Sequence, residues 1–314
     1  MFLCVSVNPA VDWRLKLPRL QTGAVNRVTE ASAAPGGKAA HVAMVLQTLG
    51  ANPIWLGFAG GTTGKVLVEG LREMGIQTEA VSTAGATRMN LEMIDDNGTV
   101  TEVLEPGSCL SSFEVQSMDE TVERLLAGRT DDATVLLSGS LPPSVPRDYY
   151  ATLISRAHKH GGRVFLDTSG EPLKFALREH PDFVKPNQEE AEWLTGSPIQ
   201  GASSAGKALQ QILEAGAAAG AISLGAQGLV WRSATTSDAL FARVPEQPAR
   251  SCVGSGDATL AGFAFAATQG LDPAESLRLA AACGAANCLA DGPGRARAAE
   301  IARLKEEIPI EKLV

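Results

Sequence analysis

The sequence Ser251-Cys252-Val253-Gly254-Ser255-Gly256-Asp257 runs directly into an apolar segment in which Leu260, Phe263, Ala264 and Ala267 recur at helical spacing. This spacing predicts a helix with Asp257 near its start. Glycines let the backbone bend and approach a ligand closely, and the free N–H groups at a helix start favour an anion. A carboxylate at the same place can take a proton from an attacking hydroxyl group. The stretch therefore predicts a phosphoryl-transfer site, although an Asp at a helix start also serves as a plain N-cap.

The composition narrows the class of protein. The chain has 314 residues, 45% of them hydrophobic, and a formal net charge of -8 at pH 7. This length suits one large domain over residues 1–314. The negative charge argues against nucleic acid as the main partner, because phosphate backbones attract basic surfaces.

The N-terminus and the cysteines indicate the compartment. Residues 1–7 have no basic leader and form a strand-like run, and no apolar run reaches membrane-spanning length. The five cysteines include no C-x-x-C pair, which favours reduced thiols over a disulfide framework or a metal site. We therefore expect a cytoplasmic protein with no membrane partner.

Short strand-like runs alternate with helix-like runs along the chain. Strands are predicted at 3–7, 54–58, 134–137, 164–166, 182–184 and 221–224, and helices at 41–49, 65–74, 114–126, 147–160, 189–194 and 204–215. This alternation predicts an α/β fold with a mostly parallel sheet and helices on both faces. In such sheets ligands bind beyond the carboxyl ends of the strands.

Two segments, 12–31 and 88–104, depart from this alternation. Extended runs at 88–94 and 99–104 flank the turn Asp95-Asp96-Asn97-Gly98. Such a turn between extended runs is typical of a hairpin. The two segments therefore predict a small β-sheet lid over a site.

Four further clusters carry candidate chemistry. Pro35-Gly36-Gly37-Lys38-Ala39-Ala40-His41 precedes a helix and adds a cation suited to phosphate, although a plain turn explains its glycines equally well. Ser138-Gly139-Ser140 places two hydroxyls at the end of a predicted strand. In Lys185-Pro186-Asn187-Gln188-Glu189-Glu190 the last acid is either an exposed helix residue or an acid that organises magnesium through water. Ser223-Leu224-Gly225-Ala226-Gln227-Gly228 leads from a strand into a glycine turn that can pass close to a nucleotide.

The pair Gly64-Lys65 is not the end of a P-loop. Residue 59 is Ala where the first glycine of that motif belongs, and Val66 stands where Ser or Thr must contact magnesium.

Taken together and in this order, the five clusters resemble the PfkB/ribokinase family of carbohydrate kinases, and its phosphosugar branch in particular. The branch-specific marks are Asn8-Pro9, Asn26-Arg27-Val28, Thr87-Arg88, Ser138-Gly139-Ser140-Leu141-Pro142 and Lys185-Pro186-Asn187. The resemblance implies a ribokinase-like, Rossmann-type sheet with a β lid that is often shared across a homodimer. It also implies ATP as donor, Mg²⁺ as cofactor and a sugar hydroxyl as acceptor.

The resemblance also implies roles for individual residues. Asp257 is similar to the catalytic base, and Gly254, Ser255 and Gly256 to the anion hole that receives the phosphoryl charge. The implied substrate-binding residues are Asp12, Arg27, Gly36, Gly37, Lys38, His41, Arg88, Ser138 and Ser140. The implied nucleotide-binding residues are Lys185, Asn187, Ser223, Gly225, Gly228, Gly284 and Asn287, and Glu190 is the implied magnesium-linked acid.

The cations favour a phosphorylated acceptor. Arg27, Arg88 and Lys38 can bind a phosphate at the end of the sugar distant from the reacting hydroxyl, unless the two arginines are ordinary exposed lid charges. We therefore expect a phosphorylated ketohexose such as fructose 1-phosphate, tagatose 6-phosphate or fructose 6-phosphate. A free sugar or a nucleoside is the alternative acceptor.

The chain departs from the family at the substrate loop. The family pattern Gly-Gly-Lys-Gly-x-Asn is here Gly36-Gly37-Lys38-Ala39-Ala40-His41. His41 is bulkier than Asn and titrates near neutrality. The replacement of the family's Gly by Ala39 and of its Asn by His41 leaves open a second class of function, a sugar-phosphate-binding homologue without turnover. The intact Asp257 argues against that function.

Overall fold

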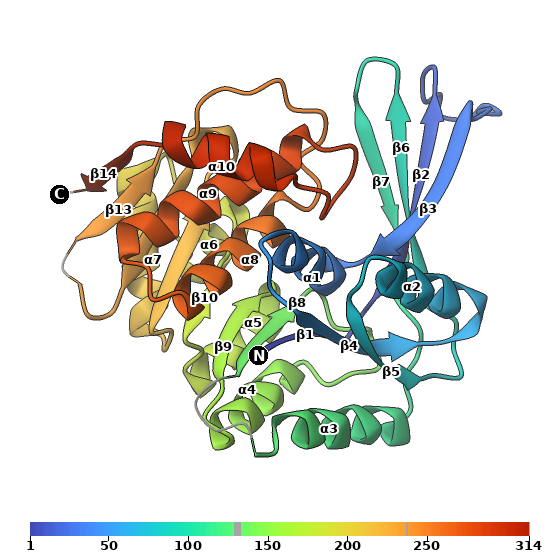
Figure 1. Cartoon of the computed structure of the whole chain (residues 1–314), viewed down its shortest axis with the longest axis horizontal. Helices are drawn as coiled ribbons and strands as arrows, with labels where there is room; N and C mark the ends of the chain where they lie inside the picture. The colour runs from blue at the N-terminus through green and yellow to red at the C-terminus, as the bar shows by residue number, and fades with distance from the viewer. Residues whose placement is uncertain (129–132, 237, 314) are drawn as a thin grey trace.

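A computed structural model describes residues 1–128, 133–236 and 238–313 and contains two β-sheets (Figure 1). The large sheet has the strand order β14-β13-β12-β11-β10-β9-β8-β1-β4-β5. Its parallel part consists of β1 (Phe2–Ser6), β4 (Pro53–Ala59), β5 (Gln77–Ser82), β8 (Thr134–Ser138), β9 (Arg163–Asp167), β10 (Phe183–Val184) and β11 (Ala219–Ser223). The antiparallel strands β12 (Leu229–Ser233), β13 (Ala239–Ala242) and β14 (Ile310–Leu313) complete one edge.

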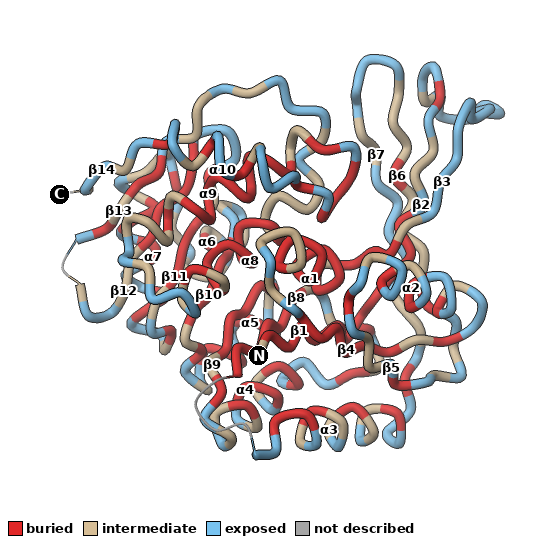
Figure 2. Tube along the Cα trace, in the orientation of Figure 1, coloured by how far each residue is buried: buried red, intermediate tan, exposed pale blue. Residues whose placement is uncertain are grey.

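Helices cover both faces of this sheet because its strands are apolar on both sides. In β1, Cys4 packs into one hydrophobic core, whereas Leu3 and Val5 pack into the other, as the two-residue period of a strand requires. The first core contains residues of α1 (Lys38–Thr48), α2 (Gly61–Glu73), α8 (Ser255–Thr268), α9 (Pro273–Leu289) and α10 (Ala298–Glu307). The second contains residues of α3 (Ser112–Leu126), α4 (Tyr149–Lys159), α5 (Gly170–Ala176), α6 (Gln188–Thr195) and α7 (Ala202–Glu214). Two short 3₁₀ turns, η1 (Leu177–Glu179) and η2 (Gly225–Gln227), lie between these elements. Figure 2 shows the buried sheet between its helical layers.

The small sheet is the lid, and it projects from the body (Figure 1). Its strand order is β3 (Glu30–Gly36), β2 (Ala10–Leu17), β6 (Arg88–Asp95) and β7 (Val100–Leu104). The predicted hairpin turn is confirmed, because Gly98 N–H donates to the Asp95 carbonyl at 2.8 Å where β6 turns into β7.

The two faces of the lid differ in polarity because neighbouring residues of a strand point to opposite sides. Paired positions Ala33, Trp13, Leu91 and Val103 form a row across all four strands, and the apolar residues Leu15 and Met93 extend the same face. The opposite face carries polar residues, namely Asp12, Arg14, Asn90, Glu92 and Glu102. The second face includes the residues that line a cavity beneath the lid.

The predicted α/β architecture is confirmed, and each of the six predicted strands and six predicted helices is present with shifted ends. The helix predicted after Asp257 is α8. The sequence analysis did not predict β5, β12, β13, β14, α5, α9 or α10. In the described part of the chain, none of the helices has the length and apolar character needed to cross a membrane.

Candidate active site

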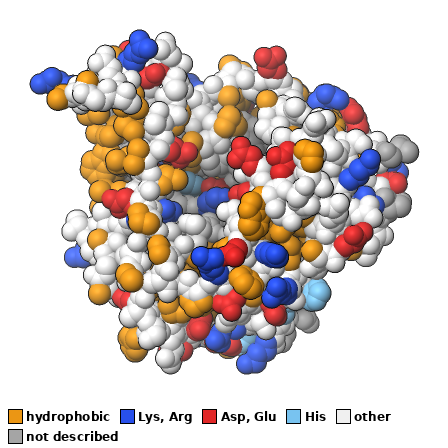
Figure 3. Space-filling model, turned by 180° about the vertical axis from the view of Figure 1, so that it is seen from behind, with side chains coloured by type: hydrophobic (Ala, Val, Ile, Leu, Met, Phe, Trp, Pro, Cys, Tyr) orange, Lys and Arg blue, Asp and Glu red, His pale blue; other side chains and the backbone are white. Residues whose placement is uncertain are grey.

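Two adjoining cavities lie at the carboxyl ends of the parallel strands. The first, here called the polar cavity, has a volume of about 490 Å³ and receives residues from the ends of neighbouring strands: Ser140 after β8, Asp167 at the end of β9, Lys185 after β10 and Ser223 at the end of β11. The second, the apolar cavity, has a volume of about 370 Å³ and shares Ser223, Ser255 and Gly256 with the first. Figure 3 shows the hollow near the centre of the molecule, where acidic and basic side chains gather.

The glycine-rich turn lies where the two cavities meet. Gly254 has a φ of 77°, and a Cβ at this position would lie 2.6 Å from Pro293 Cβ, so the position requires glycine. The N–H groups of Gly254, Gly256 and Asp257 have no hydrogen-bond partner among the described residues, whereas Ser255 N–H donates to the Cys252 carbonyl at 3.1 Å. Three amides are therefore available to an anion at the start of α8.

Asp257 does not cap α8. Gly254 is the N-cap residue, and the Asp257 side chain is buried in the first turn, where it contributes to the polar cavity. The alternative reading of Asp257 as a plain helix cap therefore does not describe this structure.

The Asp257 carboxylate instead contacts His41. His41 Nδ1 lies 2.8 Å from Asp257 Oδ2, and His41 Nε2 lies 2.8 Å from Asp12 Oδ2. Asn90 Nδ2 donates to the other oxygen of Asp12, Oδ1, at 2.9 Å. Burial alone would lower the pKa of His41, but the hydrogen bonds and charges of Asp12 and Asp257 outweigh it and raise this pKa to about 10. His41 is thus a buried cation between two acids.

A third buried acid, Asp167, contacts two lysines. Lys38 Nζ donates to Asp167 Oδ1 at 3.2 Å, and Lys185 Nζ lies 3.2 Å from Asp167 Oδ2. Burial by itself would raise the pKa of Asp167, but the charges of Lys185 and Lys38 hold it below its usual range. The pairing fixes both ammonium groups beside the helix starts of α1 and α8, where a phosphate chain would need them.

Asn187 and Glu190 form a capping box at the start of α6. Asn187 Oδ1 accepts from Glu190 N–H at 2.8 Å, and Glu190 Oε2 accepts from Asn187 N–H at 2.8 Å. Both residues also line the polar cavity. No group of three or more His, Cys, Asp or Glu side chains within the described residues could hold a metal ion. A single carboxylate is compatible with Mg²⁺, which is usually held by one or two carboxylates together with waters and nucleotide phosphates.

Arg88 contributes a further cation to the polar cavity. Its Nη1 donates to the Glu105 carbonyl at 2.7 Å, and burial lowers the pKa of its guanidinium while leaving the group charged. Glu92 also lines this cavity and accepts a hydrogen bond from Arg14 Nε at 3.0 Å; burial followed by the charge of Asp12 raises the pKa of this acid. Lys38, Lys185 and Arg88 are the cationic groups of this cavity that suit phosphate binding.

The two cavities include most of the residues singled out from the sequence. The polar cavity is lined by Asp12, Gly37, Lys38, His41, Arg88, Ser140, Lys185, Asn187, Glu190, Gly254 and Asp257. The apolar cavity is lined by Gly225, Gly228 and Gly284. Ser223, Ser255 and Gly256 line both cavities.

Four of the singled-out residues lie outside both cavities. Arg27 lies on the exposed lid loop between β2 and β3, and Ser138 is buried at the end of β8. Gly36 makes room for Asp12, because a Cβ there would lie 2.1 Å from Asp12 Oδ1. Asn287 Nδ2 donates to the Val253 carbonyl and its Oδ1 accepts from Gly294 N–H, both at 2.8 Å, so its amide holds the glycine-rich turn in place.

The sequence analysis missed Asp167 and Asn90. Asp167 directly follows the apolar run of β9 at the carboxyl end of a parallel strand, a position that could have marked it as a site residue. Asn90 lies in the predicted lid hairpin and had no comparable signal, because its contact with Asp12 depends on the pairing of β2 with β6.

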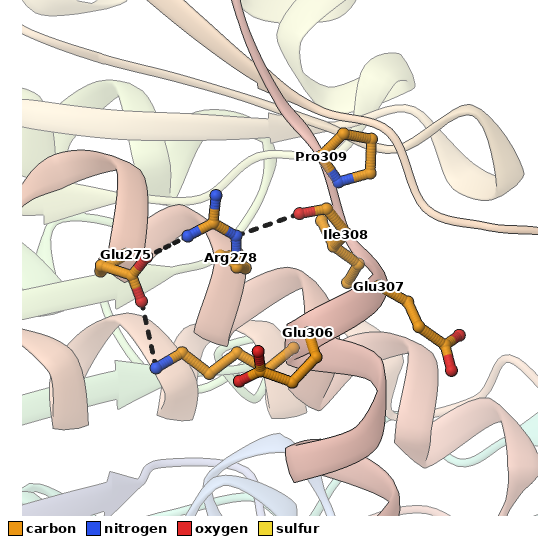
Figure 4. Close-up of a pocket in the computed structure, with 7 residues that line it drawn as sticks. Glu275, Arg278, Glu306, Glu307, Ile308 and Pro309 are labelled. Atoms are coloured by element: carbon orange, nitrogen blue, oxygen red, sulfur yellow. Dashed lines mark hydrogen bonds and ion pairs between the residues drawn. The ribbon is translucent and has the colours of Figure 1, made fainter.

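A further surface hollow lies between α9 and α10 (Figure 4). Its charged groups mainly pair with each other: Glu275 contacts both Arg278 and Lys305, and Arg278 Nε also donates to the Ile308 carbonyl at 3.0 Å. These contacts tie the C-terminal segment to the body of the protein.

Comparisons with known proteins agree with this geometry. Residues 2–299 match the sequence model of the family described as "pfkB family carbohydrate kinase". The chain is 36% identical over 279 residues to 1-phosphofructokinase of Rhodobacter capsulatus, covering 88% of this chain and 87% of that one. It is 35% identical over 269 residues to 1-phosphofructokinase of Xanthomonas campestris pv. campestris, covering 84% of this chain and 83% of that one.

A solved structure is similar over nearly the same range. The crystal structure of phosphofructokinase-2 from Escherichia coli in complex with fructose-6-phosphate has a TM-score of 0.89 and 27% sequence identity, with 98% of each chain covered. The family match extends over almost the whole chain, and the chain covers most of each curated relative. This chain therefore belongs to the pfkB family of carbohydrate kinases, which are ATP-dependent phosphotransferases.

Proposed function

We propose that this chain transfers the γ-phosphoryl group of ATP to a hydroxyl of a phosphorylated ketohexose, with fructose 1-phosphate as the first candidate. The observation that carries this proposal is the position of Asp257 and the unpaired amides of Gly254 and Gly256, where the polar and apolar cavities meet. The similarity to 1-phosphofructokinases favours fructose 1-phosphate over tagatose 6-phosphate and fructose 6-phosphate.

Asp257 is the proposed general base. The acceptor hydroxyl gives its proton to the Asp257 carboxylate while its oxygen forms a bond to the γ-phosphorus. The bond from that phosphorus to the bridging oxygen breaks, and ADP leaves. The amides at the start of α8 donate to the transferring phosphoryl group, and Lys185 and Lys38 offset its charge.

The apolar cavity is the proposed adenosine site and the polar cavity the proposed acceptor and phosphate site. Gly225, Gly228 and Gly284 line the apolar cavity without side chains, so the nucleotide can approach the backbone there. In the polar cavity, Glu190 would hold Mg²⁺ through water, and Mg²⁺ would offset charge on the nucleotide phosphates when bound. Asp12 would hold acceptor hydroxyls, and Arg88 would bind the acceptor's own phosphate.

The test is an ADP-release assay with Mg-ATP and a panel of acceptors. The panel contains fructose 1-phosphate, fructose 6-phosphate, tagatose 6-phosphate, free fructose, ribose and adenosine. We expect turnover on a phosphoketohexose and a loss of at least about a hundredfold in kcat for Asp257→Asn, with Mg-ATP binding retained by calorimetry. The control Asp96→Asn makes the same change at an exposed position in the lid turn and should retain wild-type rates.

Three results would contradict the proposal. Near-normal turnover in Asp257→Asn would show that Asp257 is not the general base. Turnover on free fructose, ribose or adenosine but on no phosphosugar would favour the alternative acceptors. If the wild-type protein binds a sugar phosphate but turns over no acceptor of the panel, the protein is a sugar-phosphate-binding homologue and not a kinase for these acceptors.

The lid supports a second proposal, a homodimer formed through its apolar face. Trp13 and Val103 on that face are 37% and 50% exposed in the single chain, and Figure 3 shows hydrophobic side chains gathered on the lid. An exposed apolar face of this kind marks an interaction surface.

A further inference from the structure

His41 lies between Asp12 and Asp257 in the polar cavity. The resemblance to the carbohydrate kinases places an Asn at this position, so the His is a departure within the site itself. The side chains of His41, Asp12 and Asp257 are 6%, 3% and 6% exposed, and the ring contacts one carboxylate through each nitrogen. Water is therefore nearly excluded from both contacts.

The chemistry of imidazole decides the protonation of this bridge. A neutral ring has one N–H and can donate to one carboxylate, which leaves its other nitrogen lone pair facing the second carboxylate. An imidazolium donates through both nitrogens and offsets one of the two buried negative charges. The geometry of two 2.8 Å contacts to carboxylate oxygens fits the imidazolium.

The bridge also fixes which carboxylate oxygens remain available. Asp12 is held at both oxygens, by His41 at Oδ2 and by Asn90 at Oδ1. Asp257 is held at Oδ2 by His41, and its Oδ1 accepts no hydrogen bond from the described residues. An Asn at position 41 carries both of its donors on one nitrogen and has no charge, so it cannot span the two acids in this way.

We propose that His41 is a positioning residue that joins Asp12 to Asp257 as an imidazolium and leaves Asp257 Oδ1 to take the proton of the acceptor hydroxyl. The roles of the two acids rest on the proposed kinase function. In the transfer step the proton passes to Oδ1, the hydroxyl oxygen bonds to the γ-phosphorus, and ADP leaves with the electrons of the broken phosphorus–oxygen bond. His41 gives up no proton in this step.

The charged groups around His41 come from many elements besides its own helix. Lys38 precedes it by one turn on α1 and is paired with Asp167 on β9. The other charged groups in the lining are Asp12 on β2, Arg88 and Glu92 on β6, Glu102 on β7, Lys185 after β10, Glu190 on α6 and Asp257 on α8. Acids outnumber cations in this set, and their field favours the proton on His41. With its pKa raised to about 10, the ring remains charged across the neutral range.

The experiment combines ¹⁵N NMR of the histidine rings with kinetics of His41→Asn. The chain has four histidines, so the His41 signals are assigned by their absence from the variant. At pH 8 we expect both ring nitrogens of His41 to carry protons in the wild-type protein. We expect His41→Asn to lower kcat at least tenfold and to change KM for Mg-ATP less than twofold. His158→Asn is the matched control, because His158 also contacts a carboxylate, Asp182 Oδ2 at 3.1 Å, but lies outside both cavities.

The alkaline limb of the pH profile gives a second readout that a purely structural role would not move. The wild-type kcat should decline as the pH approaches 10, where His41 loses a proton and one of its two hydrogen bonds, and His41→Asn should lack this component. A His41 ring with one N–H at pH 8 would overturn the proposal, as would a wild-type kcat in His41→Asn.

Failure of the proposed function would look different. If the wild-type protein turns over no acceptor in the panel, the kinase assignment fails while the NMR spectrum still decides the bridge. Two protonated ring nitrogens of His41 would then support an imidazolium that joins Asp12 to Asp257. A single protonated nitrogen would contradict it.

Discussion

At the scale of single residues, the site depends on buried charges that stabilise one another. His41 is charged because Asp12 and Asp257 surround it, and Asp167 is charged because Lys38 and Lys185 do the same for it. Isolated, each of these charges would be costly to bury, and removal of one partner would leave the other uncompensated. The same residues therefore contribute to stability and to the proposed chemistry.

Histidine 41 gives the stability of the protein a specific pH dependence. Its pKa rises from an ordinary value of 6.5 to about 10 on folding. Its contribution is therefore fully present below pH 6.5 and is lost as the pH rises toward 10, because the unfolded chain releases this proton first. Between these values the wild-type free energy of unfolding should fall by about 1 kcal/mol per pH unit more than that of His41→Asn.

Urea denaturation at pH 6.5, 7.5 and 8.5 measures this difference. Groups that titrate in both proteins contribute to both slopes of the free energy of unfolding against pH. The difference between the two slopes therefore measures the contribution of His41. Parallel slopes for wild type and His41→Asn would contradict a raised pKa of His41 in the folded state.

At the scale of elements, the start of α6 combines a structural and a proposed catalytic role. Asn187 and Glu190 form the capping box, and Glu190 also faces the proposed phosphate site. Because Gln can replace Glu in a capping box, Glu190→Gln should retain the cap and remove only the charge. Asn187→Ala removes the N-cap acceptor and should cost about 1 kcal/mol of stability.

The expected result is a separation of the two roles. Glu190→Gln should unfold within about 2 °C of the wild type and need about tenfold more Mg²⁺ for half-maximal activity. Thermal unfolding and Mg²⁺ titrations of the ADP-release assay measure the two effects. The control is Glu189→Gln, an exposed acid in the same helical turn that lies outside the cavity lining. An unchanged Mg²⁺ requirement in Glu190→Gln would remove this acid from the metal-linked role.

The elements that could be predicted from the sequence are those with a clear pattern. Strands such as β1 and β8 are continuous apolar runs, and α7 has a buried face at helical spacing. By contrast, residues 279–287 of α9 are all buried, so this half of the helix is mostly apolar on all sides and has no amphipathic period. The strands β12, β13 and β14 extend the sheet beyond its parallel part. They were missed because β12 and β13 follow β11 with no intervening α-helix and β14 carries Glu311 and Lys312, so none continues the alternation of apolar strands and helices.

The sequence motifs identified many of the residues that line the two cavities, but not the contacts between them. His41 and Asp257 are 216 residues apart in the chain, and Lys38 and Asp167 are 129 apart. A local pattern holds no information on such pairs, because the sheet order and the start of α8 bring them together. The position of Asn287 behind the glycine-rich turn follows from the same long-range packing.

At the scale of the whole molecule, the lid has one face that the single chain leaves exposed. Its polar face covers the cavity, and its apolar face, with Trp13, Leu91 and Val103 in one row, has no cover among the described elements (Figure 1). Burial of apolar surface stabilises by about 25 cal/mol per Å², so pairing two such faces favours association. We expect light scattering to give a mass of twice the 32.7 kDa of one chain.

Trp13→Glu tests whether the apolar face of the lid forms this contact. The substituted side chain is 37% exposed in the single chain, so the charge should cost the monomer little and should oppose the burial that a dimer requires. The expected mass is that of one chain, 32.7 kDa. Phe113→Glu on α3 is the matched control, because it places the same charge on a 76% exposed aromatic position away from the lid and should remain dimeric. If Trp13→Glu is still a dimer, the interface lies elsewhere on the surface. If the wild-type protein is a monomer, the apolar face of the lid does not form a homodimer.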